Sequence, residues 1–364
     1  MPGTDFYPLM KDLHALRRKI DTLDERIVDL LNRRAEVVGK IGRLKEREGV
    51  SVYSPERESE VLKRVERRNG GPLTNECLRS VYRELMSGSL SIEKSVRVAF
   101  LGPPGTFAHI AARKKFGNSV EYRPARDLAS VFEMVARGAA DYGIVPCENS
   151  FGSGISLSLD LFTKHEVKIC AEIYLSIRLS LLSKAAIEDV RVVYSHPHAF
   201  QQCQSWLRNN FGAAVDLIEV ASTTLAAEKA SKVPRAAAVA SAEVARRYGL
   251  RVIQSDIGDD SNAFTRFFVL SRDFGGASGS DRTSIVLAAE DRVGSLHEIL
   301  GTFRRQGLSL TKIESRMGPH RPRDAHFFID FLGHCADPKV KRALRSVAQL
   351  CRFLTVLGSY PAEE

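Results

Sequence analysis

The chain has 364 residues, of which 44% are hydrophobic and 27% charged, and its formal net charge is +9. This length exceeds that of one domain, and the composition is that of an ordinary soluble globular protein. Lys and Arg alternate with Asp and Glu along the expected helices, and no basic tail occurs, so we expect no nucleic acid partner.

The cysteines and the hydropathy indicate the cellular compartment of the protein. The six cysteines form no CxxC pair and no metal-ligand spacing, so we expect reduced thiols and no metal. No apolar run is long enough for a transmembrane helix, and the N-terminal stretch lacks the apolar region of a signal peptide. We therefore expect a cytoplasmic protein with no membrane contact.

Apolar residues recur every seven positions from Leu13 to Lys45, which predicts one long helix of about 50 Å. Its two apolar columns are Leu13, Ile20, Ile27, Arg34 and Ile41, and Leu16, Leu23, Leu30, Val37 and Leu44. Arg34 occupies an apolar position, and a buried guanidinium needs a counter-charge. A polar residue there can alternatively fix the register of a helical assembly, and the sequence leaves that alternative open.

Two further cations bear on this helix. Lys45 lies about 20° around the helix from Arg34, whereas Arg17 lies about 100° away and could reach the same place only from a second copy. Two shorter helices, expected from Ser54 to Asn69 and from Thr74 to Glu93, cannot cover the long helix in one copy. The sequence therefore predicts a helical dimer that encloses a cationic pocket for a small polyanion.

These residues resemble the all-helical chorismate mutase domain. The matching positions are Leu16-Arg17, Asp24, Leu30-Leu31, Arg34, Lys45, and Val52 through Arg57-Glu58. The resemblance implies that Arg17 from a partner chain, Arg34 and Arg57 hold the two carboxylates of chorismate. Such a rearrangement is a single pericyclic step, so it needs no cofactor, only a site that holds and polarises the substrate.

The resemblance also implies roles at the reacting bond. Lys45 and Glu93 would hydrogen-bond the ether oxygen, and Glu58 would hydrogen-bond the ring hydroxyl. Glu93 stands where the family usually has glutamine, and Ser54 where some relatives carry an aspartate. Because a carboxylate donates a hydrogen bond only when protonated, we expect an acid-shifted mutase optimum.

From about Ser95 the pattern changes to alternating strands and helices. The strand at residues 96–101 is followed by a turn, Gly102-Pro103-Pro104-Gly105-Thr106-Phe107, whose backbone N–H groups can bind an anion at a helix N-terminus. This turn lacks both GxGxxG and the Walker lysine, so we expect no nucleotide. Polar residues also follow later strands, at Glu148-Asn149-Ser150 and Ser195-His196-Pro197, where open α/β sheets bind ligands.

Together these motifs resemble prephenate dehydratase over residues 95–272, with Thr265-Arg266-Phe267 as the most specific match. A Ser–His–acid hydrolase is disfavoured because the adjacent Ser195 and His196 cannot form a triad. The resemblance implies two α/β lobes with the site in the cleft between them, and Thr265 as the residue that assists departure of the ring hydroxyl. Arg266 either neutralises a carboxylate or braces its strand, and the sequence does not choose. The other expected substrate-binding residues are Thr106, Glu148, Asn149, Ser150, Ser195, Thr223 and Phe267.

A glycine- and serine-rich linker at residues 275–280 precedes a βαββαβ pattern, which is that of a ferredoxin-like domain. It resembles the ACT regulatory domain, which implies L-phenylalanine as effector and edge-to-edge pairing of two copies. The expected allosteric residues are Gly294, Ser295, Leu296, His297, Glu314, Ser315 and Arg316. Val293 and Met317 replace prolines that are common in these motifs.

We thus expect a multidomain chain with an all-α mutase domain (1–94), a two-lobed α/β dehydratase domain (95–274) and an ACT domain (281–364). It would form a homodimer or higher oligomer and convert chorismate to prephenate and then to phenylpyruvate. One alternative is a dehydratase that prefers arogenate. Another, of a different class, is a two-lobed amino-acid-sensing binding protein, which Arg34 and Thr265-Arg266-Phe267 argue against.

Overall fold

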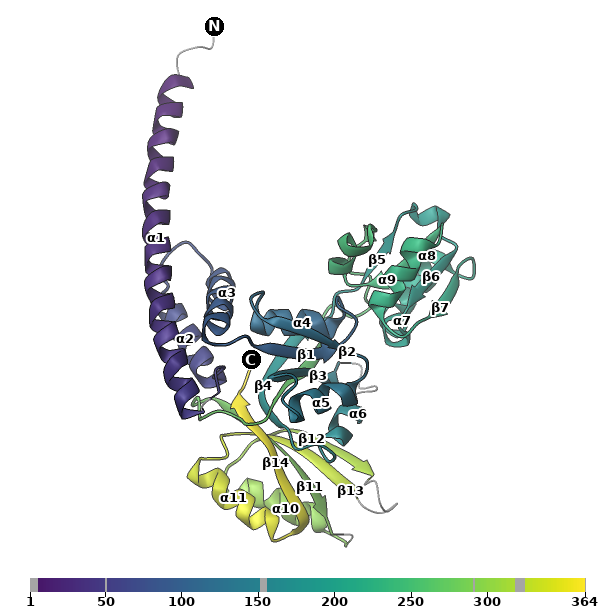
Figure 1. Cartoon of the computed structure of the whole chain (residues 1–364). Helices are drawn as coiled ribbons and strands as arrows, with labels where there is room; N and C mark the ends of the chain where they lie inside the picture. The colour runs from purple at the N-terminus through teal and green to yellow at the C-terminus, as the bar shows by residue number, and fades with distance from the viewer. Residues whose placement is uncertain (1–5, 50, 151–155, 291, 318–324, 364) are drawn as a thin grey trace.

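The computed structural model describes residues 6–49, 51–150, 156–290, 292–317 and 325–363. Three blocks follow one another along the chain: N-terminal helices, two α/β lobes, and a C-terminal sheet with two helices (Figure 1). The fold classes expected for all three blocks are confirmed. No helix in the described ranges is both long and apolar enough to cross a membrane.

The first block consists of α1 (Phe6–Glu48), α2 (Pro55–Arg68) and α3 (Asn75–Glu93). Ser54 caps α2, where its Oγ accepts a hydrogen bond from Arg57 N, and Thr74 caps α3 in the same way. The helices α2 and α3 lie beside one part of α1, and the rest of α1 extends away from the molecule (Figure 1). Apolar residues of the heptad columns are therefore exposed in the single chain, and Leu30 reaches 64%.

The first lobe holds a five-stranded sheet in the order β2-β1-β3-β10-β4. Its elements are β1 (Arg97–Leu101), α4 (Phe107–Phe116), β2 (Glu121–Ala125), α5 (Leu128–Ala136), β3 (Tyr142–Asn149), α6 (Ser156–Leu161), β4 (Lys168–Ser176) and β10 (Phe264–Ser271). The strands β1, β2 and β3 are parallel, and β10 runs antiparallel between β3 and β4. The last strand of this lobe thus comes from a distant part of the sequence.

The second lobe holds a sheet in the order β7-β6-β8-β5-β9. Its strands are β5 (Ser180–Ser183), β6 (Val192–Ser195), β7 (Asp216–Glu219), β8 (Ala236–Ala240) and β9 (Arg251–Gln254), and its helices are α7 (Pro197–Gln202), α8 (Gln204–Phe211) and α9 (Thr223–Lys232). The chain enters this lobe after β4 and leaves it before β10. Where it crosses, Ile177 N donates to Ala263 O at 2.8 Å, so Thr265, the second residue of β10, lies near the junction of the two lobes.

The C-terminal block has the expected βαββαβ order. Its elements are β11 (Asp281–Ala289), α10 (Ser295–Arg305), β12 (Leu310–Met317), β13 (Ala325–Leu332), α11 (Pro338–Ala348) and β14 (Cys351–Pro361), with the sheet in the order β12-β13-β11-β14. This sheet packs against the first lobe, where Gly358 meets β4. A Cβ on Gly358 would lie 2.0 Å from the carbonyl oxygen of Ile169, so only glycine permits this approach. Phe328 and Tyr360 join the first lobe's buried core.

Candidate active site

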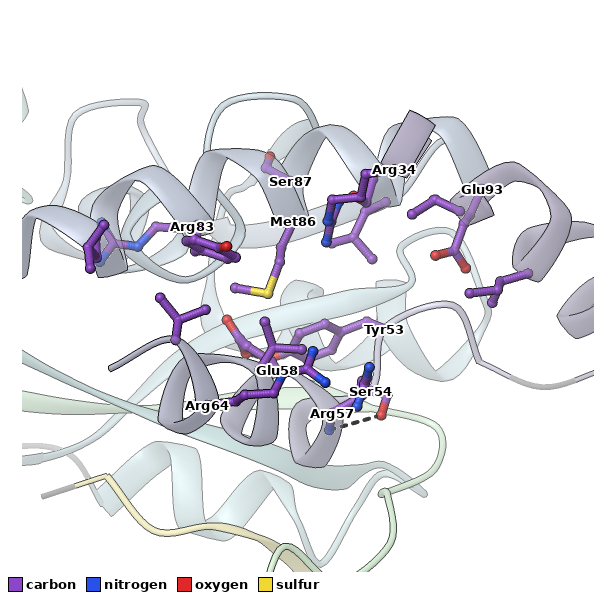
Figure 2. Close-up of a pocket in the computed structure, with 18 of the residues that line it drawn as sticks. Arg34, Tyr53, Ser54, Arg57, Glu58, Arg64, Arg83, Met86, Ser87 and Glu93 are labelled. Atoms are coloured by element: carbon purple, nitrogen blue, oxygen red, sulfur yellow. Dashed lines mark hydrogen bonds between the residues drawn. The ribbon is translucent and has the colours of Figure 1, made fainter. Parts of the chain in front are cut away.

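A cavity of about 900 Å³ lies among α1, α2 and α3. Its cationic lining comprises Arg34 and Lys45 from α1, Arg57, Arg64 and Arg68 from α2, Arg83 from α3, and Lys115 from α4. Figure 2 shows Arg34 and Glu93 on one side of this cavity, with Tyr53, Arg57 and Glu58 on the other. Such a concentration of positive charge in a concave, partly apolar site suits a small dianion.

Arg34 and Lys45 enter the same cavity, as the helical geometry predicted. The Arg34 guanidinium donates to Ser89 Oγ on α3. Lys45 Nζ donates to Val52 O at 2.6 Å and lies 3.1 Å from Glu93 Oε2. Hydrogen bonds to protein groups thus hold both cations at the wall, where each can still meet an anion in the cavity.

Glu93 lies unusually close to α1 because Gly42 has no side chain. A Cβ on Gly42 would lie 3.0 Å from both the Cα and the Cγ of Glu93. The carboxyl side chain is only 8% exposed, and it reaches the cavity beside Lys45. A glycine within a helix lowers helix stability by about 1 kcal/mol relative to alanine, so this one has a packing reason.

The opposite wall carries Arg57 and Glu58 at the start of α2. Arg57 pairs with the exposed Glu60 at 2.5 Å. Glu58 is more enclosed, and its Oε2 accepts a hydrogen bond from Tyr53 Oη at 2.7 Å. Burial, followed by the charge of Glu58, raises the pKa of Tyr53 well above its usual range, so this phenol stays protonated and donates.

Several lining residues were missed by sequence reasoning. Ser89 accepts a hydrogen bond from Arg34, and Tyr53 donates one to Glu58. Arg64 and Arg83 add positive charge to the wall. The apolar period of α3 could have placed Ser89 near the cavity, because it lies four residues before Glu93 on the same helix face. Arg17 is exposed and does not line the cavity that the described residues of one chain form.

The dehydratase motifs meet where the two lobes join. Thr265 on β10 is half-buried and lies directly opposite Asn149 on β3, so both side chains share one face of the sheet. Ser150 anchors the start of β10: its N–H donates to Phe264 O at 3.1 Å, and its Oγ accepts from Phe264 N at 3.2 Å. The pairing therefore brings Thr265, Asn149 and Ser150 together.

Arg266 lies on the other face of the same strand and is 2% exposed. Its Nε donates to Glu172 at 2.7 Å, one Nη to Asp330 at 2.6 Å, and the other to Tyr360 at 3.1 Å. Glu148 lies on this face too, 3.3 Å from Arg266 and 3.4 Å from Lys312. Of the two alternatives left open by the sequence, these contacts favour the brace, because every carboxylate that Arg266 meets here belongs to the protein.

Of the remaining residues expected to bind substrate in this block, some lie near the turn before α4 and others are buried in the core. Thr106 caps α4, and the turn before it meets α9, since a Cβ on Gly105 would lie 3.4 Å from Thr224 Oγ1. Thr223, one residue earlier, is thus close to that turn. Ser195 is fully buried and donates to Val239 O at 2.7 Å, and Phe267 is buried in the core. Neither lies where a substrate could touch it without rearrangement.

The two expected allosteric motifs lie on different elements of the C-terminal block. Gly294 precedes α10 with a φ of +85°, and Ser295, Leu296 and His297 form its first turn. The Oγ of Ser295 is buried without a hydrogen-bond partner among the described atoms. Glu314, Ser315 and Arg316 lie on β12, the edge strand of the sheet. The second motif thus lies at a sheet edge, and in the first motif Ser295 is buried whereas Gly294 and His297 are exposed.

The fold and the cavity define a helical, polyanion-binding domain joined to a two-lobed α/β domain and a ferredoxin-like domain. Family models match residues 16–94 as chorismate mutase type II and residues 98–274 as prephenate dehydratase. The chain is 42% identical to the bifunctional chorismate mutase/prephenate dehydratase of Aquifex aeolicus, covering 97% of this chain and 98% of that one.

Other relatives agree with this match. The bifunctional chorismate mutase/prephenate dehydratase of Escherichia coli K12 is 30% identical, with 96% of each chain covered. A solved prephenate dehydratase from Arthrobacter aurescens, in complex with L-Phe, has a TM-score of 0.68 and 32% identity, covering 73% of this chain and 90% of that one. The chain therefore belongs to the bifunctional chorismate mutase/prephenate dehydratase family.

Proposed function

We propose that this chain rearranges chorismate to prephenate in its helical block and converts prephenate to phenylpyruvate in its two-lobed block, on the route to phenylalanine. The observation that carries the mutase assignment is that Arg34 and Lys45 enter one cavity together with Glu58 and Glu93. The pairing of Thr265 with Asn149 at the lobe junction supports the dehydratase assignment. The domain boundaries proposed are 1–94, 95–274 and 281–364.

The mutase site would act by holding a flexible dianion in its reactive shape. Arg34 and Arg57 would bind the two carboxylates, and Glu58 would accept a hydrogen bond from the ring hydroxyl. Lys45 would stabilise the negative charge that grows on the ether oxygen as its bond to carbon breaks. Glu93 would assist when protonated, because only then can it donate to that oxygen.

A second copy would complete this site. The exposed apolar face of α1 supports a helical dimer, and the exposed Arg17 would reach the cavity of a partner chain. Mixing full-length Arg17→Ala and Arg34→Ala chains tests this directly. We expect each variant alone to be inactive as a mutase, and the mixed dimers to regain activity because one of their two sites is intact. An active Arg17→Ala variant would contradict the shared site.

In the dehydratase block, Thr265 would hydrogen-bond the departing ring hydroxyl while the carboxylate leaves as carbon dioxide. Aromatisation of the ring drives this step, so a positioned donor suffices. Asn149, Ser150, Thr106 and Thr223 would bind the substrate around it. For Arg266, Glu148, Ser195 and Phe267 we propose supporting roles, because their side chains are engaged by protein groups or buried in the core.

The C-terminal block would bind L-phenylalanine and inhibit the dehydratase. The orphaned Ser295 hydroxyl at the start of α10 supports this, since a buried polar group needs a partner. The prephenate dehydratase from Arthrobacter aurescens was solved in complex with L-Phe. We also propose a cytoplasmic location and pairing of two copies through the β12 edge.

One assay of the full-length protein tests these activities together. Loss of chorismate and appearance of phenylpyruvate would be followed with and without L-phenylalanine, and prephenate and arogenate would be compared as substrates. We expect turnover of chorismate and prephenate and inhibition of the second step. Binding of these compounds without turnover would instead indicate an amino-acid-sensing protein.

A further inference from the structure

The mutase cavity has a wall that does not come from the mutase helices. Lys115 and Phe116, the last two residues of α4, line it from the dehydratase block. Lys115 Nζ lies 3.1 Å from Glu58 Oε2, and their side chains are 14% and 13% exposed. This is an enclosed ion pair between two blocks that catalyse different reactions.

The end of α4 is fixed firmly against α3. Gly117 ends α4 with a φ of +68°, and a Cβ there would lie 2.6 Å from the Cβ of Ser87. Asn118 donates from its backbone and side chain to Glu84, at 3.1 and 2.8 Å, and Ser119 N donates to Ser87 Oγ at 2.9 Å. Lys115, two residues before this turn, is therefore held at a defined position over the cavity.

Aromatic packing also fixes the junction between α4 and the mutase helices. Phe116 lies 5.0 Å from Tyr53 and 5.2 Å from Tyr142, measured between ring centroids. Tyr53 is the residue that donates to Glu58. The phenol and the ammonium both contact the Oε2 atom, so Oε1 is the oxygen left for the substrate hydroxyl.

The side chain of Lys115 is protonated and positively charged. Burial alone would lower its pKa, but the carboxylates of Glu58 and Glu363 outweigh that effect and raise the pKa above its usual range. Glu363 lies 3.5 Å from Lys115, farther than Glu58, and its backbone N–H donates to Glu172 in the first lobe. The ammonium thus stays charged throughout the range in which enzymes work.

We propose that Lys115 is a positioning residue of the mutase site, supplied by the dehydratase block, which orients the Glu58 carboxylate to accept a hydrogen bond from the ring hydroxyl of chorismate. This inference rests on the role proposed above for Glu58. The carboxylate contacts the hydroxyl in both the ground state and the transition state. Loss of its orientation therefore raises KM more than it lowers kcat.

The test uses the full-length protein and the chorismate mutase assay. Lys115→Met and Glu58→Gln each raise KM for chorismate by about 10- to 100-fold, the range for losing a hydrogen bond to a charged group, with little change in kcat. Lys115→Arg, which keeps a cation beside the carboxylate, restores most of the affinity. In the double variant the two effects do not add, because Lys115 acts through Glu58.

Two controls separate positioning from folding. Lys114→Met changes the adjacent lysine, which donates to Tyr174 O and does not line the cavity, and it leaves KM for chorismate unchanged. Prephenate dehydratase activity of every variant, measured in the same preparation, reports whether the α4 lobe is intact. Lys115→Gln, a polar replacement of similar length, gives the same rise in KM if Lys115→Met fails to fold.

Two results would overturn the inference. A wild-type KM in Lys115→Gln, with a raised KM in Glu58→Gln, shows that Glu58 binds substrate without help from the dehydratase block. Fully additive effects in the double variant show that Lys115 acts elsewhere. A wild-type KM in Glu58→Gln differs from both results. It would show that Glu58 does not bind the substrate, which contradicts the role proposed for Glu58 in the mutase site.

Discussion

Arg266 Nη1 lies 2.6 Å from Asp330 Oδ2, and this contact joins the strand of Thr265 to the C-terminal sheet. The same guanidinium donates to Glu172, which is fully buried on β4. Because adjacent residues of a strand face opposite sides, Arg266 anchors the backbone while Thr265 faces the lobe junction. A change in the C-terminal sheet therefore has a direct physical route to the dehydratase strand.

Arg266→Met should destabilise the protein by about 3–5 kcal/mol, because it leaves the buried Asp330 without its counter-charge and leaves Glu172 with Arg282 alone. Urea unfolding followed by circular dichroism measures this. Arg123→Met is the matched control, since Arg123 forms an exposed pair with Glu121 and should change stability by less than about 1 kcal/mol. Equal stabilities of the two variants would show that the buried cluster does not hold the lobe and the sheet together.

Thr265→Ala should reduce dehydratase turnover by about 100-fold or more, the contribution typical of a positioned proton donor, and leave mutase activity intact. The hydroxyl is lost at the lobe junction, far along the chain from the helical cavity. Thr265→Ser keeps the donor and should retain much of the activity. Both activities are measured on the same preparation, and persistent dehydratase activity in Thr265→Ala would count against this site.

Gly42→Ala should impair the mutase, because a methyl group there would come within 3.0 Å of Glu93 and displace it from Lys45. Displacing a catalytic group by about 1 Å can lower the rate by about 100-fold. Gly39→Ala on the same helix is the matched control, since its nearest neighbour would be 3.8 Å away. That variant should gain about 1 kcal/mol of helix stability and keep its activity.

Glu93→Gln should raise the kcat of the mutase, because the amide that replaces the carboxylate can donate a hydrogen bond to the ether oxygen. In the wild type the carboxylate lies 3.1 Å from the Lys45 ammonium and attracts it. Initial rates at saturating chorismate measure this, and an unchanged or lower kcat in Glu93→Gln would contradict the proposed role of Glu93.

The dehydratase should lose activity in acid through His109. Its Nδ1 accepts a hydrogen bond from Gly105 N at 3.1 Å, and burial, followed by the charge of Arg113, lowers its pKa below 6.5. The neutral form is favoured in the folded state. The hydrogen bond from Gly105 N to His109 is therefore fully formed above the pKa that His109 has in the unfolded chain. It is lost as the pH falls through the lower pKa that His109 has in the folded protein.

His109→Asn provides the check on that prediction. The asparagine Oδ1 can accept the same hydrogen bond and does not titrate in this range. Dehydratase activity of the variant should decline less steeply below pH 6.5 than that of the wild type. Parallel declines in the two proteins would place the titrating group elsewhere.

The sequence determined much of the helical block by itself. The heptad columns fixed one long helix, and the spacing of Arg34 and Lys45 placed both cations on one side of it, because helical geometry depends only on local backbone angles. The βαββαβ order followed from local apolar periods in the same way. The resemblance of Thr265-Arg266-Phe267 to a dehydratase motif identified the strand but not the direction of each side chain.

Only the tertiary structure decided which distant groups meet. Arg266 could have faced substrate or protein, and the register of β10 with β3 and β4 turned it toward Glu172 and Asp330. Lys115 reaches Glu58 because α4 docks on α3 across a boundary that the sequence marks as the end of a domain. Such contacts depend on packing between segments far apart in the chain, and no local period or motif records them.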